Sequence, residues 1–125
     1  MIAWVAVGVG AALGAWLRWG LGLWLNASNY PVPLGTLVAN LGGGFVIGFA
    51  VAMFQTYSNL PMEWRLFLIT GFLGGLTTFS TFSAEAMLLL QRGQYLWVFA
   101  HSALHLIGSI GFCIAGYASW RSISN

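Results

Sequence analysis

Four long runs of hydrophobic residues alternate with short polar segments along this chain. Each run is close to or longer than the roughly 20 residues that cross a bilayer as a helix. The runs cover about residues 2–25, 34–54, 64–90 and 95–120. Prolines at 31, 33 and 61 and a glycine at 93 interrupt the chain between them. The pattern predicts an all-α integral membrane protein in which residues 1–125 form one domain of four transmembrane helices.

Aromatic residues gather at the ends of these runs, where side chains of membrane helices meet the lipid headgroups. They are Trp24, Tyr30, Tyr57, Trp64, Tyr95, Trp97 and Trp120. The first run has no basic start and contains Arg18 near its end, so we interpret it as a membrane helix rather than a signal peptide.

The composition excludes several classes of protein. Hydrophobic residues make up 59% of the chain and charged residues only 5%, too few to cover a water-exposed surface. Four arginines against two glutamates give too little positive charge for nucleic-acid binding. A single cysteine, Cys113, excludes an intramolecular disulfide. No nucleophile–base pair, phosphate loop or complete metal site is visible, so we do not expect an enzyme.

The arginines give the chain no preferred orientation in a membrane. Four spans would place Arg65 and Arg121 on one side and Arg18 and Arg92 on the other. Such a balance has two explanations: chance in a small protein, or copies that insert in both directions and pair. Four helices can hardly enclose a polar pore, so we favour an antiparallel, dual-topology homodimer.

The second run combines polar residues and glycines on one helical face. Thr36, Asn40, Gly44 and Gly48 follow one another at steps of four. The two glycines form a GxxxG pattern, which is typical of close helix packing. Asn40 is costly in lipid and indicates a functional role, and both interpretations can hold on the same face.

The third run holds the densest polar signal. Three glycines, at 71, 74 and 75, precede five hydroxyl residues within positions 77–83. Because these residues disfavour an uninterrupted helix, we predict a break near Gly74–Thr78. The freed carbonyl groups must then face protein, water or an ion. The alternative is a kink with hydroxyl groups bonded to i−4 carbonyls.

Two phenylalanines, Phe79 and Phe82, follow the predicted break. Such rings in a membrane helix usually face lipid or core, but the edge of an aromatic ring is positive and these rings stand among hydroxyl donors. A lining of this kind can solvate a small anion without trapping it. An ionised Glu85 would repel an anion, so it should accept hydroxyl donors, be protonated or pair with an arginine.

Polar residues in the fourth run also share one face. His101, His105, Ser109 and Gly116 follow at steps of four or seven. Two histidines at i,i+4 can bind a metal. However, the chain has no other histidine and no aspartate, so a closed metal site would need ligands from across a dimer. We favour a hydrogen-bonding stripe.

Two segments carry a family resemblance. Residues 74–85, GGLTTFSTFSAE, resemble the third-helix signature of the Fluc/CrcB fluoride channels, and residues 35–41, GTLVANL, resemble the second-helix motif of that family. The position of Arg18, the four-span layout and the length also agree, so the resemblance covers essentially the whole chain.

The resemblance implies a passive fluoride exporter of the bacterial inner membrane, a dual-topology homodimer with two fluoride pathways. The residues implied in the pathway are Thr36, Asn40, Phe79, Ser80, Thr81, Phe82, Ser83, Glu85, His105 and Ser109, with His101 just before the fourth-helix positions. It also implies a structural sodium ion at the dimer centre, held by the backbone carbonyls of Gly74 and Thr77.

Two other functions compete with this one. Small multidrug resistance exporters are also short, four-spanning and dual-topology, but they need a membrane-embedded carboxylate in the first helix, and this first run has none. A structural subunit without transport would equally suit the glycine-rich packing motif at residues 71–75.

Overall fold

Helices form nearly all of the computed structural model, which describes residues 1–26 and 30–125. In chain order they are α1 (Ile2–Leu25), α2 (Leu34–Thr56), α3 (Met62–Arg65), the π-helix η1 (Leu66–Leu73), α4 (Gly74–Leu76), α5 (Phe79–Gln91) and α6 (Tyr95–Ser124). Part of the first predicted connector, at 27–29, lies outside the described residues.

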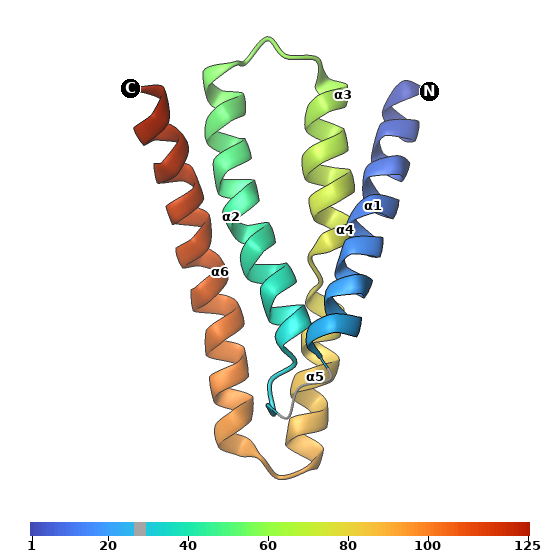
Figure 1. The fold of residues 1–125 in the computed structure, drawn as a ribbon, viewed down its shortest axis with the longest axis vertical. Helices are drawn as coiled ribbons and strands as arrows, with labels where there is room; N and C mark the ends of the chain where they lie inside the picture. Colours follow the sequence, from blue (N-terminus) through green and yellow to red (C-terminus); the bar gives the residue numbers. More distant parts are fainter. Residues whose placement is uncertain (27–29) are drawn as a thin grey trace.

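Within residues 1–26 and 30–125, four helical stretches are long and apolar enough to cross a membrane. They are Ile2–Leu25, Leu34–Thr56, Met62–Gln91 and Tyr95–Ser124, so α3, η1, α4 and α5 together make the third. The predicted all-helical fold with four membrane-capable helices is therefore confirmed. Both termini lie at the same end as the loop between α2 and α3, as four spans require (Figure 1).

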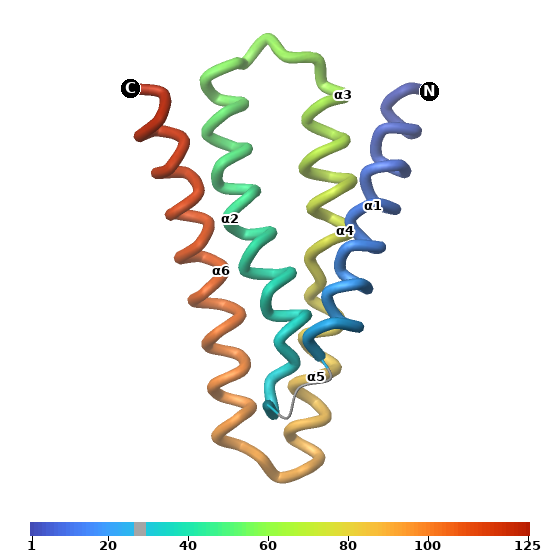
Figure 2. Tube along the Cα trace, in the orientation of Figure 1, coloured from blue at the N-terminus to red at the C-terminus, as the bar shows by residue number. Residues whose placement is uncertain are grey.

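The helices pack mainly in two pairs. α2 lies along α6, and α1 lies along η1 and α4 (Figure 2). Glycines bring the first pair together: a Cβ at Gly48 would meet the backbone oxygen of Cys113, and one at Gly116 would meet that of Phe45. Gly44 lies against the backbone of Ser109. The packing interpretation of the Gly44–Gly48 pattern is confirmed.

The third membrane helix is broken where the glycines meet the hydroxyl residues. Thr77 and Thr78 have extended backbone angles, with ψ of 155° and 123°, and α5 begins at Phe79. The Thr78 hydroxyl caps α5 by accepting the Thr81 N–H. Bonding to an i−4 carbonyl also occurs, from the Thr77 hydroxyl to Leu73 at 2.8 Å, but it accompanies the break rather than replacing it. The π-helix just before the break was not predicted.

Large apolar side chains cover the outside of the bundle, as a lipid-facing surface requires. The inside is small, with Ala39, Leu73 and Leu76 at its centre. Among the residues that the structure describes, three polar side chains are nevertheless buried: Thr36, His101 and His105. They lie on α2 and α6, facing the helix that follows the break.

Candidate ion pathway

Asn40 on α2 binds the backbone at the break. Its Oδ1 accepts the Thr78 N–H at 2.8 Å, and its Nδ2 donates to the Thr78 carbonyl at 3.0 Å. The amide thus satisfies the Thr78 N–H, which an unbroken helix would have paired internally, and adds a second donor to the carbonyl group that begins α5. One asparagine makes an interrupted helix tolerable at this depth.

Arg18 on α1 binds the same region from the other side. Its Nε donates to the Gly75 carbonyl at 3.1 Å, across 57 positions of sequence. The sequence placed Arg18 only near the end of its helix and gave no partner for it. The predicted break could have indicated this partner, because it frees carbonyl acceptors and a guanidinium has only hydrogen-bond donors.

The carbonyl groups of Gly74 and Thr77 are among those that lose their α-helical partners at the break. The Gly74 carbonyl would pair with the Thr78 N–H, which donates to Asn40 instead. The Thr77 carbonyl would pair with the Thr81 N–H, which donates to the Thr78 hydroxyl. Gly74 and Thr77 are the residues predicted to hold sodium through backbone oxygens, and oxygen ligands of this kind suit a hard cation.

The two phenylalanines after the break occupy different surroundings. Phe79 is 79% exposed and contacts the Phe82 ring at a centroid distance of 5.4 Å. Phe82 also stacks on His101 at 4.9 Å and lies tilted against His105 at 4.8 Å. The Phe82 ring therefore lies between the exposed Phe79 ring and the buried imidazoles of His101 and His105.

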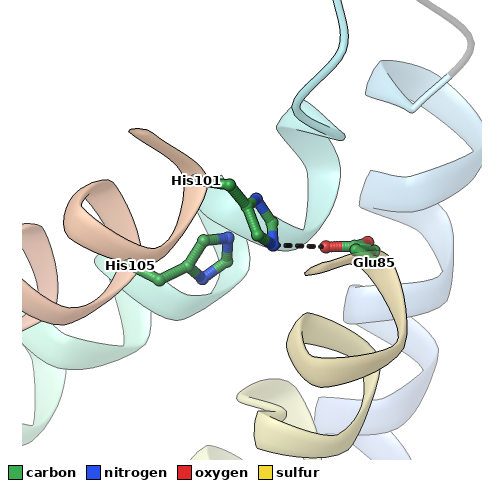
Figure 3. Close-up of side chains that lie close together, drawn as sticks. All are labelled: Glu85, His101 and His105. Atoms are coloured by element: carbon green, nitrogen blue, oxygen red, sulfur yellow. Dashed lines mark ion pairs between the residues drawn. The ribbon is translucent and has the colours of Figure 1, made fainter. Parts of the chain in front are cut away.

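Glu85 and the two histidines form a polar cluster (Figure 3). Glu85 Oε2 accepts the Thr36 hydroxyl at 2.6 Å, and Oε1 lies 3.5 Å from Nε2 of the fully buried His101. The same Nε2 lies 3.3 Å from the Phe82 carbonyl. Of the three arrangements expected for Glu85, the structure shows a hydroxyl donor, together with an imidazole in place of an arginine.

The cluster brings three possible metal ligands together within one chain. Ligand atoms of Glu85, His101 and His105 lie within 4.8 Å of one another. A closed zinc site has four protein ligands, so the expectation that such a site needs a ligand from across a dimer stays a prediction. Zinc binds nitrogen at ~2.0–2.1 Å, so the side chains would have to move closer together to hold it.

Contacts between helices occupy one ring nitrogen of each histidine. Asn40 Nδ2 lies 3.0 Å from His105 Nδ1, and His101 Nε2 faces two oxygen acceptors. The other ring nitrogen of each histidine, and Glu85 Oε1, have no hydrogen-bond partner among the described residues. The arrangement agrees with the hydrogen-bonding stripe favoured for α6.

A cavity of about 450 Å³ lies beside the break. Five predicted pathway residues line it, and so do both predicted sodium ligands: Asn40, Phe79, Phe82, His105, Ser109, Gly74 and Thr77. Thr36 and Glu85 lie deeper, in the polar cluster. Ser80, Thr81 and Ser83 do not line the cavity; Thr81 bonds to Thr78, and Ser83 donates to the Phe79 carbonyl at 2.9 Å.

Comparison with known proteins gives one consistent answer. Residues 5–117 match the family model described as CrcB-like protein, Camphor Resistance (CrcB). The chain is 57% identical to the fluoride-specific ion channel FluC of Cupriavidus pinatubonensis, over 96% of this chain and 95% of the relative. It is 57% identical to FluC of Pseudomonas putida, over 96% and 94%, and 58% identical to FluC of Burkholderia thailandensis, over 94% and 91%.

Proposed function

Because this chain belongs to the CrcB family, we propose that it is a fluoride-selective ion channel that mediates passive fluoride export across the membrane. The observation that carries this function is the high identity to fluoride-specific channels over nearly the whole length. The chain is a multi-pass membrane protein, and we place it in the bacterial inner membrane. A small multidrug resistance-like exporter is not favoured, because α1 has no carboxylate.

The cavity beside the break is suited to a small anion. It combines ring edges from Phe79 and Phe82 with polar groups from Asn40, His105 and Ser109. Arg18 reaches the break, but its Nε–H donates to the Gly75 carbonyl group. Attraction without a fixed cation in the lining lets an ion enter and leave again.

The exposed face of the chain at the break supports an antiparallel homodimer with two pores. Phe79, Ser80 and Gly74 all lie on the outside of a single chain. A broken backbone next to lipid would be unfavourable, so a second copy is the natural cover. The balanced arginines favour a partner of opposite orientation.

A sodium ion at the centre of this dimer would bind the carbonyl oxygens that the break leaves without helical partners. The Gly74 and Thr77 carbonyls have lost their helical N–H partners to side chains. Two copies related by symmetry would supply four such oxygens. The cation would take the place of the lost N–H donors at the negative ends of these carbonyl dipoles. The Thr77 side chain would not be a ligand.

Two measurements test the proposal. Purified protein reconstituted into liposomes should release fluoride, followed with a fluoride electrode, much faster than it releases chloride under the same gradient. Equal rates for both ions would remove fluoride selectivity. For topology, a C-terminal tag should be accessible from both sides of the membrane; a tag found on one side only would exclude the antiparallel dimer.

A further inference from the structure

The polar cluster of Glu85, His101 and His105 is incomplete as a hydrogen-bonding network. Glu85 Oε1, His101 Nδ1 and His105 Nε2 are buried and have no hydrogen-bond partner among the described residues. His101 is fully buried, and His105 is only 5% exposed. Buried polar atoms without a partner are unfavourable, so the cluster has the capacity to bind a further group.

The contacts of His101 Nε2 are long for hydrogen bonds. This nitrogen lies 3.3 Å from the Phe82 carbonyl oxygen and 3.5 Å from Glu85 Oε1. N–H···O hydrogen bonds usually measure about 2.7–3.2 Å. Two ligands of a tetrahedral zinc ion, each ~2.0–2.1 Å from it, lie roughly 3.4 Å apart. The separation of Glu85 Oε1 and His101 Nε2 therefore matches two ligands of one ion more closely than a donor and its acceptor.

His105 supplies a third ligand. One ligand atom from each of the three residues lies within 4.8 Å of the others. The tip of the His105 ring, which carries Nε2, points toward His101 (Figure 3). The longest separation has to shrink by no more than roughly 1.4 Å to reach the spacing of zinc ligands.

The chemistry of the three ligands determines which ion they select. His101 is the only described basic side chain within 4 Å of the Glu85 carboxylate. A carboxylate inside a membrane protein is stabilised by a cation partner. Two imidazole nitrogens and one carboxylate oxygen suit a first-row transition ion such as Zn²⁺, whereas Ca²⁺ and Mg²⁺ take oxygen ligands.

We propose that Glu85, His101 and His105 bind a divalent transition-metal ion of the zinc type, and that the bound ion blocks fluoride conduction. Three protein ligands leave the fourth position open to water or an anion. His105 also lines the cavity, so a dication held there traps an anion instead of letting it pass. The block rests on the proposed function, whereas metal binding does not.

The cluster is close to one end of the bundle. Thr36, which donates to Glu85, is the third residue of α2, and His101 is the seventh residue of α6. Both helices begin at the same end (Figure 1). At about 1.5 Å per residue, the cluster lies within about two turns of that end. A metal ion therefore reaches it from the water on that side without crossing the membrane.

Binding has a cost that keeps it reversible. Coordination through Nε2 places the proton of His105 on Nδ1, which lies 3.0 Å from the NH₂ group of Asn40. The ion therefore replaces one hydrogen bond between α2 and α6, and the metal affinity is lowered by that loss. A chelator in solution should consequently remove the ion.

Cobalt(II) is the probe for the site, because its visible absorption becomes much stronger when it moves from water into a four-coordinate site. Full-length protein in detergent, freed of any histidine tag, should give this absorption at one ion per chain, and Zn²⁺ should abolish it. Glu85→Gln, His101→Gln and His105→Gln should each lower the Co²⁺ affinity by more than about tenfold, because each removes a ligand. Cys113→Ser is the control, since it removes a half-buried thiol outside the cluster and should bind as wild type does.

No Co²⁺ absorption in wild type would overturn the site. So would unchanged affinity in the double variant His101→Gln/His105→Gln, or loss of binding in Cys113→Ser. If the cluster variants elute as aggregate on size exclusion, the absorption of wild type and its displacement by Zn²⁺ decide by themselves.

Flux tests the block. Zn²⁺ on both sides should stop fluoride release from wild-type liposomes, and EDTA should restore it, whereas release by His101→Gln should be the same with and without Zn²⁺. Zn²⁺ that binds but leaves wild-type release unchanged would overturn the block. Failure of the proposed function looks different: liposomes that release no fluoride even without metal would remove the channel, while Co²⁺ absorption would still report the site.

Discussion

Replacing Phe82 or Phe79 with isoleucine keeps an apolar side chain but removes the positive ring edge. Phe82 contacts three rings, those of Phe79, His101 and His105, and Phe79 contacts only Phe82. An aromatic pair adds about 0.5–1.5 kcal/mol beyond buried area, so the two extra pairs make Phe82→Ile about 1–3 kcal/mol more destabilising than Phe79→Ile. Fluoride flux should nevertheless fall by orders of magnitude in both variants.

The assay pairs flux with stability for the same preparations. Fluoride release from liposomes reports transport, and thermal unfolding with size exclusion reports folding. A methionine variant at each position is a third arm, because its thioether is polarisable but has no ring edge. If flux instead followed stability, with near-normal transport in Phe79→Ile, the rings would be packing elements and the proposed pathway would be wrong.

Three further predictions concern the packing and the break. Arg18→Leu should lower the melting temperature, because it leaves the half-buried Gly75 carbonyl without its donor, at a cost of up to ~1–3 kcal/mol, and Arg18→Lys should lower it less; equal melting of wild type and Arg18→Leu would contradict the contact. Gly116→Ala should disrupt α2–α6 packing and shift the protein to aggregate on size exclusion, whereas Gly20→Ala, with nothing within 4 Å, should be tolerated; a normal elution of the first would contradict this packing. Thr77→Val should keep sodium-dependent thermal stability, measured in sodium against potassium, because the carbonyl remains; loss of that dependence would assign the ligand to the hydroxyl instead.

The four helices and the break could be predicted because both depend on local sequence. Hydrophobic runs of membrane length indicate spans. Glycines followed by hydroxyl residues weaken a helix wherever it lies, and Thr77 and Thr78 are extended as that predicts. The close contact of Gly44 and Gly48 with α6 follows from the absence of side chains, which is also a local property.

The partners at the break could not be predicted, because they are distant in sequence. Asn40 and Thr78 are 38 positions apart, and Arg18 and Gly75 are 57 apart. Likewise, the sequence spacing of His101 and His105 places them on one face of α6 but does not reveal that Glu85 faces them. That neighbour depends on how far α5 rotates after the break, which no pattern of polar residues specifies.

The π-helix was also not predicted, because a run of apolar residues does not distinguish a π-helix from an α-helix. In η1 each hydrogen bond spans one more residue than in an α-helix. Such a segment can lose one residue and relax to ordinary α geometry without breaking. One residue lost from an α-helix turns everything after it by about 100°. In η1 the wider turns already hold an extra residue, so relaxation to α geometry absorbs most of that rotation. A single-codon deletion within 66–73 would therefore leave Gly75 and Thr78 facing Arg18 and Asn40, whereas the same deletion in α1 or α2 would turn those side chains away from the break.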